Sequence, residues 1–322
     1  MKKPDPVEQA LDRLSALRHA APGSEVTQEL KAFLKNRSNV VVAKAAKIAG
    51  ETHATELVPE LMAAFHRLMA NPEKLDKGCA ATTEIAAALY ELDYTEPEIY
   101  LLGIYHVQME GSFGPPVDAA AKLRGVSALG LARTRHPQAL EEIVTLLVDA
   151  WQAARIGAVR ALASNGGHAG SLLLRLKLLT GEQEPDVLAE CFSGLLAGTG
   201  ESALPLVASY VDSPDLAVAE AALLAIGSSR LPGAFILLKE KSARTAAGPL
   251  RRITLLAIAM LRSDEAVKFL LACLADGSAQ TAKDALMALA IFRTNEKVRA
   301  QVEAAVVSRD DSSLTEVFRQ EF

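Results

Sequence analysis

Aromatic residues and cysteines are both scarce in this sequence of 322 residues. Phe, Trp and Tyr make up 5% of the chain, although half of its residues are hydrophobic. The core must therefore be built from Ala, Leu, Val and Ile, a composition typical of packed helices. The three cysteines, Cys79, Cys191 and Cys273, lie far apart within apolar segments. This placement indicates buried, reduced thiols and excludes a disulfide framework as the basis of the fold.

An excess of positive charge and a long hydrophobic run are also missing. The net charge is −5, and neither half of the chain is basic, which argues against a general nucleic-acid-binding surface. No apolar run approaches the roughly 20 residues of a membrane span. The N-terminal residues are not followed by the apolar stretch of a signal peptide. We therefore expect a cytoplasmic protein, with neither a membrane nor a nucleic acid as its partner.

Motifs of the common catalytic and metal sites are absent as well. The chain has no Walker loop, dinucleotide-binding glycine motif, HExxH, paired CxxC or GxSxG. Its histidines are scattered singly, and none has a recognisable metal-ligand spacing. Glu110 follows His106 by one helical turn, which is more typical of a solvated helix pair than of half a metal site. The sequence predicts no catalytic residue, no metal and no cofactor, and we expect a protein that is not an enzyme.

What the sequence does contain is an internal repeat. Small residues three positions apart, such as Ala158 and Ala161, are followed by a large apolar residue, and this pattern returns eight times. The spacings between successive copies are 40, 40, 33, 33, 31, 32 and 31 residues, measured at one equivalent position in each copy: Ala49, Leu89, Leu129, Leu162, Leu195, Ile226, Ile258 and Leu289. A period in this range over nearly the whole chain is typical of a stack of helical pairs.

Each repeat also contains an earlier apolar segment of helical character, and turn signals lie between the two segments. No segment shows the alternation of a strand. We therefore predict an all-α fold, a right-handed α-solenoid of about eight helical pairs that forms a single domain over 1–322. A capping helix is expected at 4–20, repeats at 24–294 and a C-terminal cap at 295–322.

The alanine-rich rhythm of these pairs resembles HEAT repeats, and the short period of the second half resembles the HEAT-like repeats named after phycobilisome lyases. The stretch from Gly114 to Gly130 is also similar to one in uncharacterised bacterial HEAT-repeat proteins. The resemblance implies the architecture, and it implies that the second helices line a concave surface. It implies no single activity, because the broad family includes scaffolds, adaptors, bilin lyase subunits and a few DNA glycosylases.

The repeat is interrupted at residues 94–118, and this insertion is the candidate site. Four of the five tyrosines fall in residues 90–105, and amphipathic aromatics are frequent in recognition surfaces. Packing within an unusually long repeat would explain them equally well, and both explanations stay open here. The candidate binding residues of the insertion are Tyr94, Tyr100, Tyr105, His106 and Phe113.

A locally basic stretch follows the insertion, with Lys122, Arg124, Arg155 and Arg160 on predicted second helices. Guanidinium groups beside aromatic side chains suit acidic peptides, carboxylates or phosphates. We therefore predict a protein–protein interaction scaffold or adaptor, monomeric, which binds a protein or an acidic peptide in a concave groove near repeats two to four. Two alternatives stay open: a chromophore (bilin) lyase subunit and a HEAT-like DNA glycosylase.

Overall fold

The computed structural model describes residues 5–21, 23–111 and 114–322, and most of them are helical. The chain divides into two compact units, Met1–Leu173 and Leu174–Phe322.

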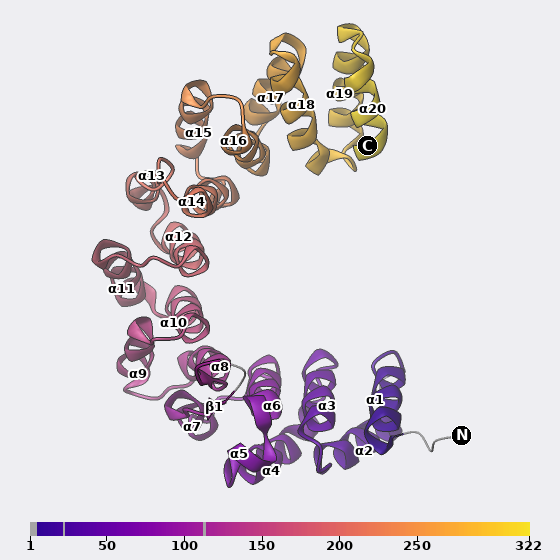
Figure 1. The fold of residues 1–322 in the computed structure, drawn as a ribbon, viewed down its shortest axis with the longest axis vertical. Coiled ribbons are helices and arrows are strands. Elements are labelled where there is room, and N and C mark those ends of the chain that lie inside the picture. Colours follow the sequence, from indigo (N-terminus) through magenta and orange to yellow (C-terminus); the bar gives the residue numbers. More distant parts are fainter. Residues whose placement is uncertain (1–4, 22, 112–113) are drawn as a thin grey trace. The chain divides into compact units, whose positions relative to one another are not determined.

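Unit 1 consists of a first helix followed by helical pairs (Figure 1). The first helix, α1 (Pro6–Leu17), occupies the segment predicted as the N-terminal cap and packs on α3. The pairs are α2 (Ser24–Leu34) with α3 (Asn39–Glu51), α4 (Val58–Met69) with α6 (Ala80–Glu91), α7 (Glu98–Tyr105) with α8 (Ala121–Arg133), and α9 (Ala139–Thr145) with α10 (Gln152–Asn165). Short elements join some of them: η1 (Thr55–Leu57), α5 (Pro72–Leu75), η2 (Lys77–Cys79), β1 (Met109–Glu110), β2 (Val117–Asp118) and η3 (Leu146–Val148).

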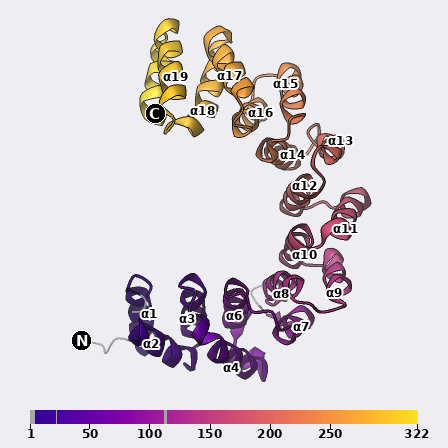
Figure 2. The same ribbon diagram turned by 180° about the vertical axis from the view of Figure 1, so that it is seen from behind.

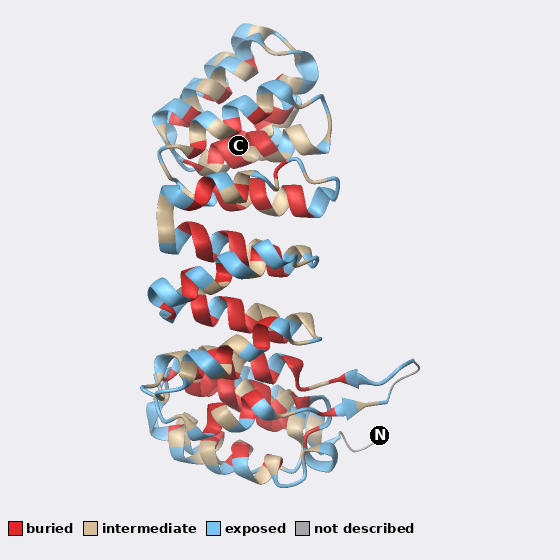
Figure 3. Cartoon of the chain, turned by 90° about the vertical axis from the view of Figure 1, so that its left-hand side faces the viewer, coloured by how far each residue is buried: buried red, intermediate tan, exposed pale blue. Residues whose placement is uncertain are grey.

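Within unit 1 the helices lie in two rows. The second helices α3, α6, α8 and α10 pack on one another in sequence, and the first helices α2, α4, α7 and α9 lie on one side of them (Figures 1 and 2). Figure 3 shows that buried residues are concentrated along the helices, whereas most turns are exposed.

Unit 2 continues the same pattern. The chain crosses from unit 1 within α11 (Gly167–Thr180), the first helix of the fifth pair. The remaining elements are α12 (Pro185–Thr199), η4 (Gly200–Ala203), α13 (Leu204–Ala208), α14 (Leu216–Ser229), α15 (Ala234–Arg244), α16 (Pro249–Met260), α17 (Asp264–Asp276), α18 (Ala279–Leu289), η5 (Ala290–Phe292), α19 (Glu296–Arg309) and α20 (Ser312–Glu321).

The prediction of an all-α stack of about eight helical pairs is confirmed. The eight equivalent positions of the repeat fall one in each second helix, from Ala49 in α3 to Leu289 in α18. The absence of strands was predicted wrongly, because β1 and β2 form a short antiparallel pair in the third repeat. The right-handed twist and the single-domain organisation stay predictions. Over the described ranges, no helix is both long and apolar enough to cross a bilayer.

The small residues of the repeat allow the second helices to approach closely. Gly125 of α8 faces Gly157 of α10, and a Cβ added at Gly157 would lie 2.1 Å from the Gly125 Cα. Unit 2 contains a similar close contact, since a Cβ at Gly227 in α14 would lie 2.4 Å from the carbonyl oxygen of Ala257 in α16. Contacts this short would force the helices apart, so glycine at these positions sets the spacing between repeats.

We expect Gly157→Ala to lower the free energy of unfolding by roughly 1–3 kcal/mol, the usual cost of overpacking a tight contact. The measurement is urea unfolding followed by far-UV circular dichroism. Gly111→Ala is the control, because a Cβ at Gly111 meets no atom within 4 Å. Equal unfolding midpoints for the two variants would contradict the role of Gly157.

Candidate functional site

The two longest repeats place their extra residues next to each other. Repeats two and three span 40 residues each, against 31–33 for the later ones. In repeat two the additional residues form α5 and η2, between α4 and α6. In repeat three they form the β1–β2 hairpin between α7 and α8, which extends beyond the ends of the helices (Figure 3). We call the described turns within repeats two, three and four (residues 70–79, 105–111, 114–120 and 148–151) the turn edge.

Asp76 anchors the part of the turn edge that belongs to repeat two. Its side chain is fully buried and accepts hydrogen bonds from the backbone N–H groups of Ala81 (2.9 Å) and Thr82 (2.8 Å). The Thr82 hydroxyl donates a further bond of 2.7 Å. A carboxylate at this position satisfies free N–H groups of the first turn of α6 and interacts favourably with the helix dipole.

Gln108 joins this loop to the hairpin of repeat three. Only 2% of the residue is exposed, and its side-chain Nε2 donates to the carbonyl oxygen of Asp76 at 3.1 Å and to Glu110 at 2.6 Å. Glu110 also accepts the backbone N–H of Gly78 at 2.7 Å. The inserted segments of two different repeats are therefore held together by one buried and one exposed hydrogen bond.

The backbone of the repeat-two loop is unusual beside Gln108. Gly78 and Cys79 have φ values of +74° and +48°, and the second is strained because a side chain rarely adopts this conformation. The Cys79 thiol lies 3.2 Å from Gln108 Oε1. Burial, together with the charges of Asp76, Glu110 and Asp118, raises the pKa of this thiol to about 12. It therefore stays protonated at neutral pH and is not a nucleophile.

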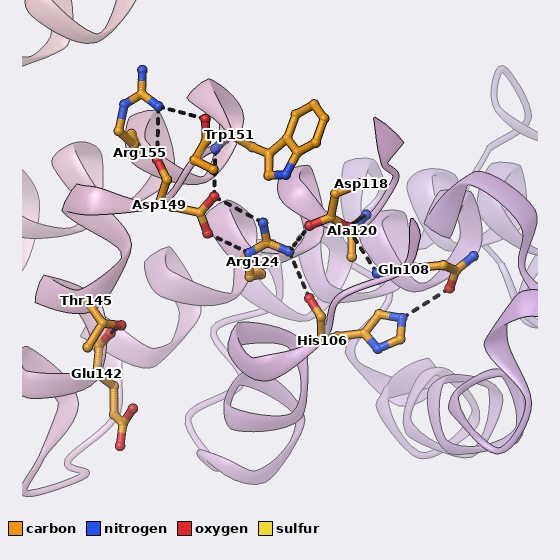
Figure 4. Close-up of polar contacts among 11 residues, drawn as sticks. His106, Gln108, Asp118, Ala120, Arg124, Glu142, Thr145, Asp149, Trp151 and Arg155 are labelled. Atoms are coloured by element: carbon orange, nitrogen blue, oxygen red, sulfur yellow. Dashed lines mark hydrogen bonds and ion pairs between the residues drawn. The ribbon is translucent and has the colours of Figure 1, made fainter. Parts of the chain in front are cut away.

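Arg124 ties the hairpin to the next repeat (Figure 4). It lies in the first turn of α8, and only 5% of its side chain is exposed. Its Nη1 donates to Asp118 at 2.6 Å and to the carbonyl oxygen of His106 at 2.9 Å. Its Nε and Nη2 donate to the two oxygens of Asp149 at 2.9 and 3.1 Å. The guanidinium thus connects both ends of the hairpin with the turn of repeat four.

Asp149 extends the network into α10. It accepts the backbone N–H of Trp151 at 2.8 Å, and its own carbonyl oxygen accepts Arg155 Nη1 at 2.9 Å. Trp151 is half-buried, and its backbone N–H is the group bound to Asp149 in Figure 4. Three successive repeats are therefore joined at the turn edge by polar contacts.

The predicted basic floor of a groove has a different arrangement in the structure. Arg124 was predicted as a binding residue, but it is buried between the carboxylates of Asp118 and Asp149. Lys122 is exposed and lies 3.6 Å from Glu84. Arg155 binds the backbone of the repeat-four turn, and Arg160 is exposed on α10. The structure brings Arg124 and Arg155 together at Asp149, and binding by any of the four stays a prediction.

The predicted aromatic residues separate into packing and surface positions. Tyr100 is fully buried, donates its hydroxyl to the carbonyl oxygen of Tyr94 at 3.0 Å, and lies against Gly130 of α8. The half-buried Tyr94 ring lies 6.3 Å from that of Tyr100. Tyr105, in contrast, is 65% exposed and donates to Glu142 of α9. His106 is half-buried, with Nε2 3.1 Å from Gln108 Oε1. Phe113 lies outside the described residues.

Exposed apolar side chains concentrate at the turn edge. Of the 15 exposed large hydrophobic residues that the structure describes, six lie here: Leu75, Tyr105, Val107, Met109, Val117 and Val148. Val107 and Met109 are exposed on either side of the buried Gln108, just before and at the start of β1. Val148 is 80% exposed. Five of these residues were not predicted from the sequence, although the two spacings of 40 residues were a signal for this region: Leu75, Val107, Met109, Val117 and Val148.

The polar groups inside the turn edge bind one another. Its buried carboxylates are occupied by hydrogen bonds and its thiol is protonated. Within the part of the chain that the structure describes, no group of three or more His, Cys, Asp and Glu side chains is arranged to hold a metal ion.

Comparison with known proteins adds a likeness of fold. No family model and no curated protein matches the chain. Among solved structures, a chain from the complex of CpcE and CpcF of phycocyanin lyase from Nostoc sp. PCC7120 is similar, with 16% identity and a TM-score of 0.38. The match covers 91% of this chain and 96% of that chain. A likeness at these values carries no inference about activity or partners.

We expect Arg124→Ala to lower the free energy of unfolding by about 3–5 kcal/mol, because it leaves Asp118 and Asp149 without their cation in a buried site. Urea unfolding followed by the fluorescence of Trp151, the single tryptophan, reports on this region directly. The stability of Arg124→Lys should fall between those of the wild type and Arg124→Ala. Lysine keeps the positive charge but lacks the planar guanidinium that binds both oxygens of Asp149. The control is the exposed Arg37→Ala, for which a change within about 0.5 kcal/mol is expected. A similar value for Arg124→Ala would contradict the structural role of the network.

Asp118 should make the stability of the protein depend on pH. Burial raises the pKa of Asp118, but hydrogen bonds from Gln108, Arg124 and Ala120 outweigh it and hold the pKa below the ordinary value of 3.8. Between the folded and unfolded pKa values the unfolded chain binds the extra proton, so stability is lost as the pH falls through this window. Asp118→Asn should lower stability at neutral pH, and its loss of stability between about pH 5 and pH 3 should be smaller than in the wild type. The exposed Asp12→Asn is the control, and an identical pH profile for Asp118→Asn would rule out this contribution.

Proposed function

We propose that this chain is a non-enzymatic interaction scaffold that docks a protein or peptide partner on the turn edge of repeats two to four. The observation that carries the proposal is the concentration of exposed apolar side chains there, chiefly Tyr105, Val107, Met109 and Val148. Clustered exposed apolar groups in a folded protein mark interaction surfaces, because water exposure of such groups is unfavourable unless a partner covers them.

The rigid support of this surface favours the same function. Gln108, Arg124 and Asp149 hold the inserted segments to one another and to the neighbouring repeats. A surface that is ordered before binding loses less conformational entropy on binding. Buried polar networks and strained backbone at a turn, as at Cys79, are also typical of segments kept for function rather than for the core.

The proposed docking surface lies in the same repeats, two to four, as the one predicted from the sequence, but on a different face. The sequence predicts a concave groove lined by second helices, with Arg124 among its binding residues. The proposed surface lies instead at the turns that join first and second helices, where the apolar side chains are exposed and the arginine acts as internal support.

The chromophore-lyase and DNA-glycosylase alternatives rest on the sequence resemblance. A visible absorbance shift on mixing with a tetrapyrrole would support the first. A salt-dependent affinity for duplex DNA would support the second. The charge arrangement is less suited to DNA, since Arg124 lies between two carboxylates and Lys122 pairs with Glu84.

The test is site-specific photo-crosslinking with the full-length chain. A photoreactive amino acid at Met109 or Val148 should capture a defined partner from native lysate. The same amino acid at Val307, which is 73% exposed on α19, should not capture it. Val107→Ser with Met109→Ser should weaken binding of that partner about tenfold or more, which corresponds to about 1.4 kcal/mol.

Stability should change by no more than about 0.5 kcal/mol in this double variant, because both side chains are exposed. Val307→Ser is the matched control for the binding measurement. Capture of the same partner from Val307 and Met109 alike, or unchanged affinity of the double variant, would show that the turn edge is not the docking surface.

A further inference from the structure

A shallow, open groove lies on the exposed side of α7 and ends at the turn edge. It is lined by Glu98, Leu101, Leu102, Tyr105 and His106 and has a volume of about 340 Å³. Leu102 is 41% exposed and Tyr105 is 65% exposed. Tyr105 is the last residue of α7, so the groove ends where the chain enters the segment that carries Val107 and Met109.

Carboxylates border this apolar groove. The Glu98 side chain lies at its start and is 68% exposed. Glu142 of α9 accepts the Tyr105 hydroxyl, and Glu141 beside it is exposed. The C-terminus of α7 adds to the negative charge around the groove, since the last carbonyl groups of a helix carry partial negative charge. The Tyr105 ring, next to Glu142, is a further favourable site for a cation.

The neighbouring cationic groups do not offset these carboxylates. Arg133 lies over the Tyr90 ring, with its guanidinium carbon 3.7 Å from the ring centre, and donates to Asp93 at 3.1 Å. Arg135 is exposed, but it lines a different cavity with Thr95 and Pro137. His66 lies 3.9 Å from Glu98 and is charged only when protonated.

We infer that the partner segment that docks on this groove is basic and amphipathic, with apolar residues that cover Leu102 and Tyr105 and Lys or Arg residues that face Glu98 and Glu142. The inference rests on the proposed docking function and specifies the chemistry of the partner. Complementary charge around an apolar contact selects partners and speeds their association. The charge of this partner is opposite to that of the acidic partner expected from Lys122 and the three arginines.

The experiment uses the full chain and three fluorescein-labelled peptides measured by fluorescence anisotropy at low salt. Two peptides share one helical Leu/Phe stripe and carry either Lys or Glu at every polar position. The third has the composition of the Lys peptide in scrambled order, which removes the stripe. The Lys peptide should bind at least about tenfold more tightly than the other two.

Variants then locate the binding. Leu102→Ser should abolish most of the affinity for the Lys peptide, and Glu98→Gln with Glu142→Gln should remove most of its preference over the Glu peptide. Glu303→Gln, an exposed change on α19, is the matched control and should leave both values unchanged. Equal or tighter binding of the Glu peptide, or equal binding of the scrambled peptide, would overturn the inference.

Failure of the inference and failure of the proposed function give different results. If the Lys peptide does not bind but Met109 still captures a native partner by photo-crosslinking, the basic partner is wrong and the docking surface stands. If the Lys peptide binds and its binding does not respond to Leu102→Ser, the groove is wrong as its site. If neither peptide binding nor capture from Met109 is seen, both proposals fail.

Discussion

The close approach of neighbouring second helices is the constraint on which the rest of unit 1 depends. Gly125 and Gly157 bring the backbones of α8 and α10 together, with no room for a Cβ between them. At this spacing the turns of repeats three and four lie within reach of one side chain. Arg124 can therefore bind Asp118 in its own repeat and Asp149 in the next. A wider spacing would leave the buried carboxylates without their cation, which is unfavourable in a low-dielectric environment.

The extra residues of repeats two and three are stable because they are adjacent. A short hairpin alone is marginal in water. Here Gln108 connects it to the loop that follows α4, and Asp118 connects it to Arg124. These contacts place the polar side chains inside and leave Val107 and Met109 exposed. The same contacts therefore explain both how β1 and β2 are held in place and why the apolar side chains that we propose for docking are exposed.

Several parts of this structure could be predicted from the sequence because they depend on local patterns. Helical periodicity, small residues three apart and turn signals recur in each repeat, so the helical pairs follow from the chain itself. The insertion was also visible, through the spacing of 40 residues and the tyrosines. The roles of individual residues could not be predicted. Tyr100 and Tyr105 have the same side chain and lie five positions apart, but Tyr100 is buried against Gly130 in the folded chain, whereas Tyr105 is exposed. Arg124 was predicted as a surface group for the same reason, since the sequence does not show that Asp118 and Asp149 flank it.

The sequence by itself determined the fold class, the number of helical pairs and the place where the repeat is interrupted. Each of these follows from residues that are neighbours along the chain or one turn apart on a helix. Tertiary structure decided which polar residues support the insertion and which apolar residues stay exposed. The reason is that charge pairing and burial depend on contacts between repeats, such as Gln108 with Asp76 and Arg124 with Asp149, whose partners lie 32 and 25 residues apart in the sequence.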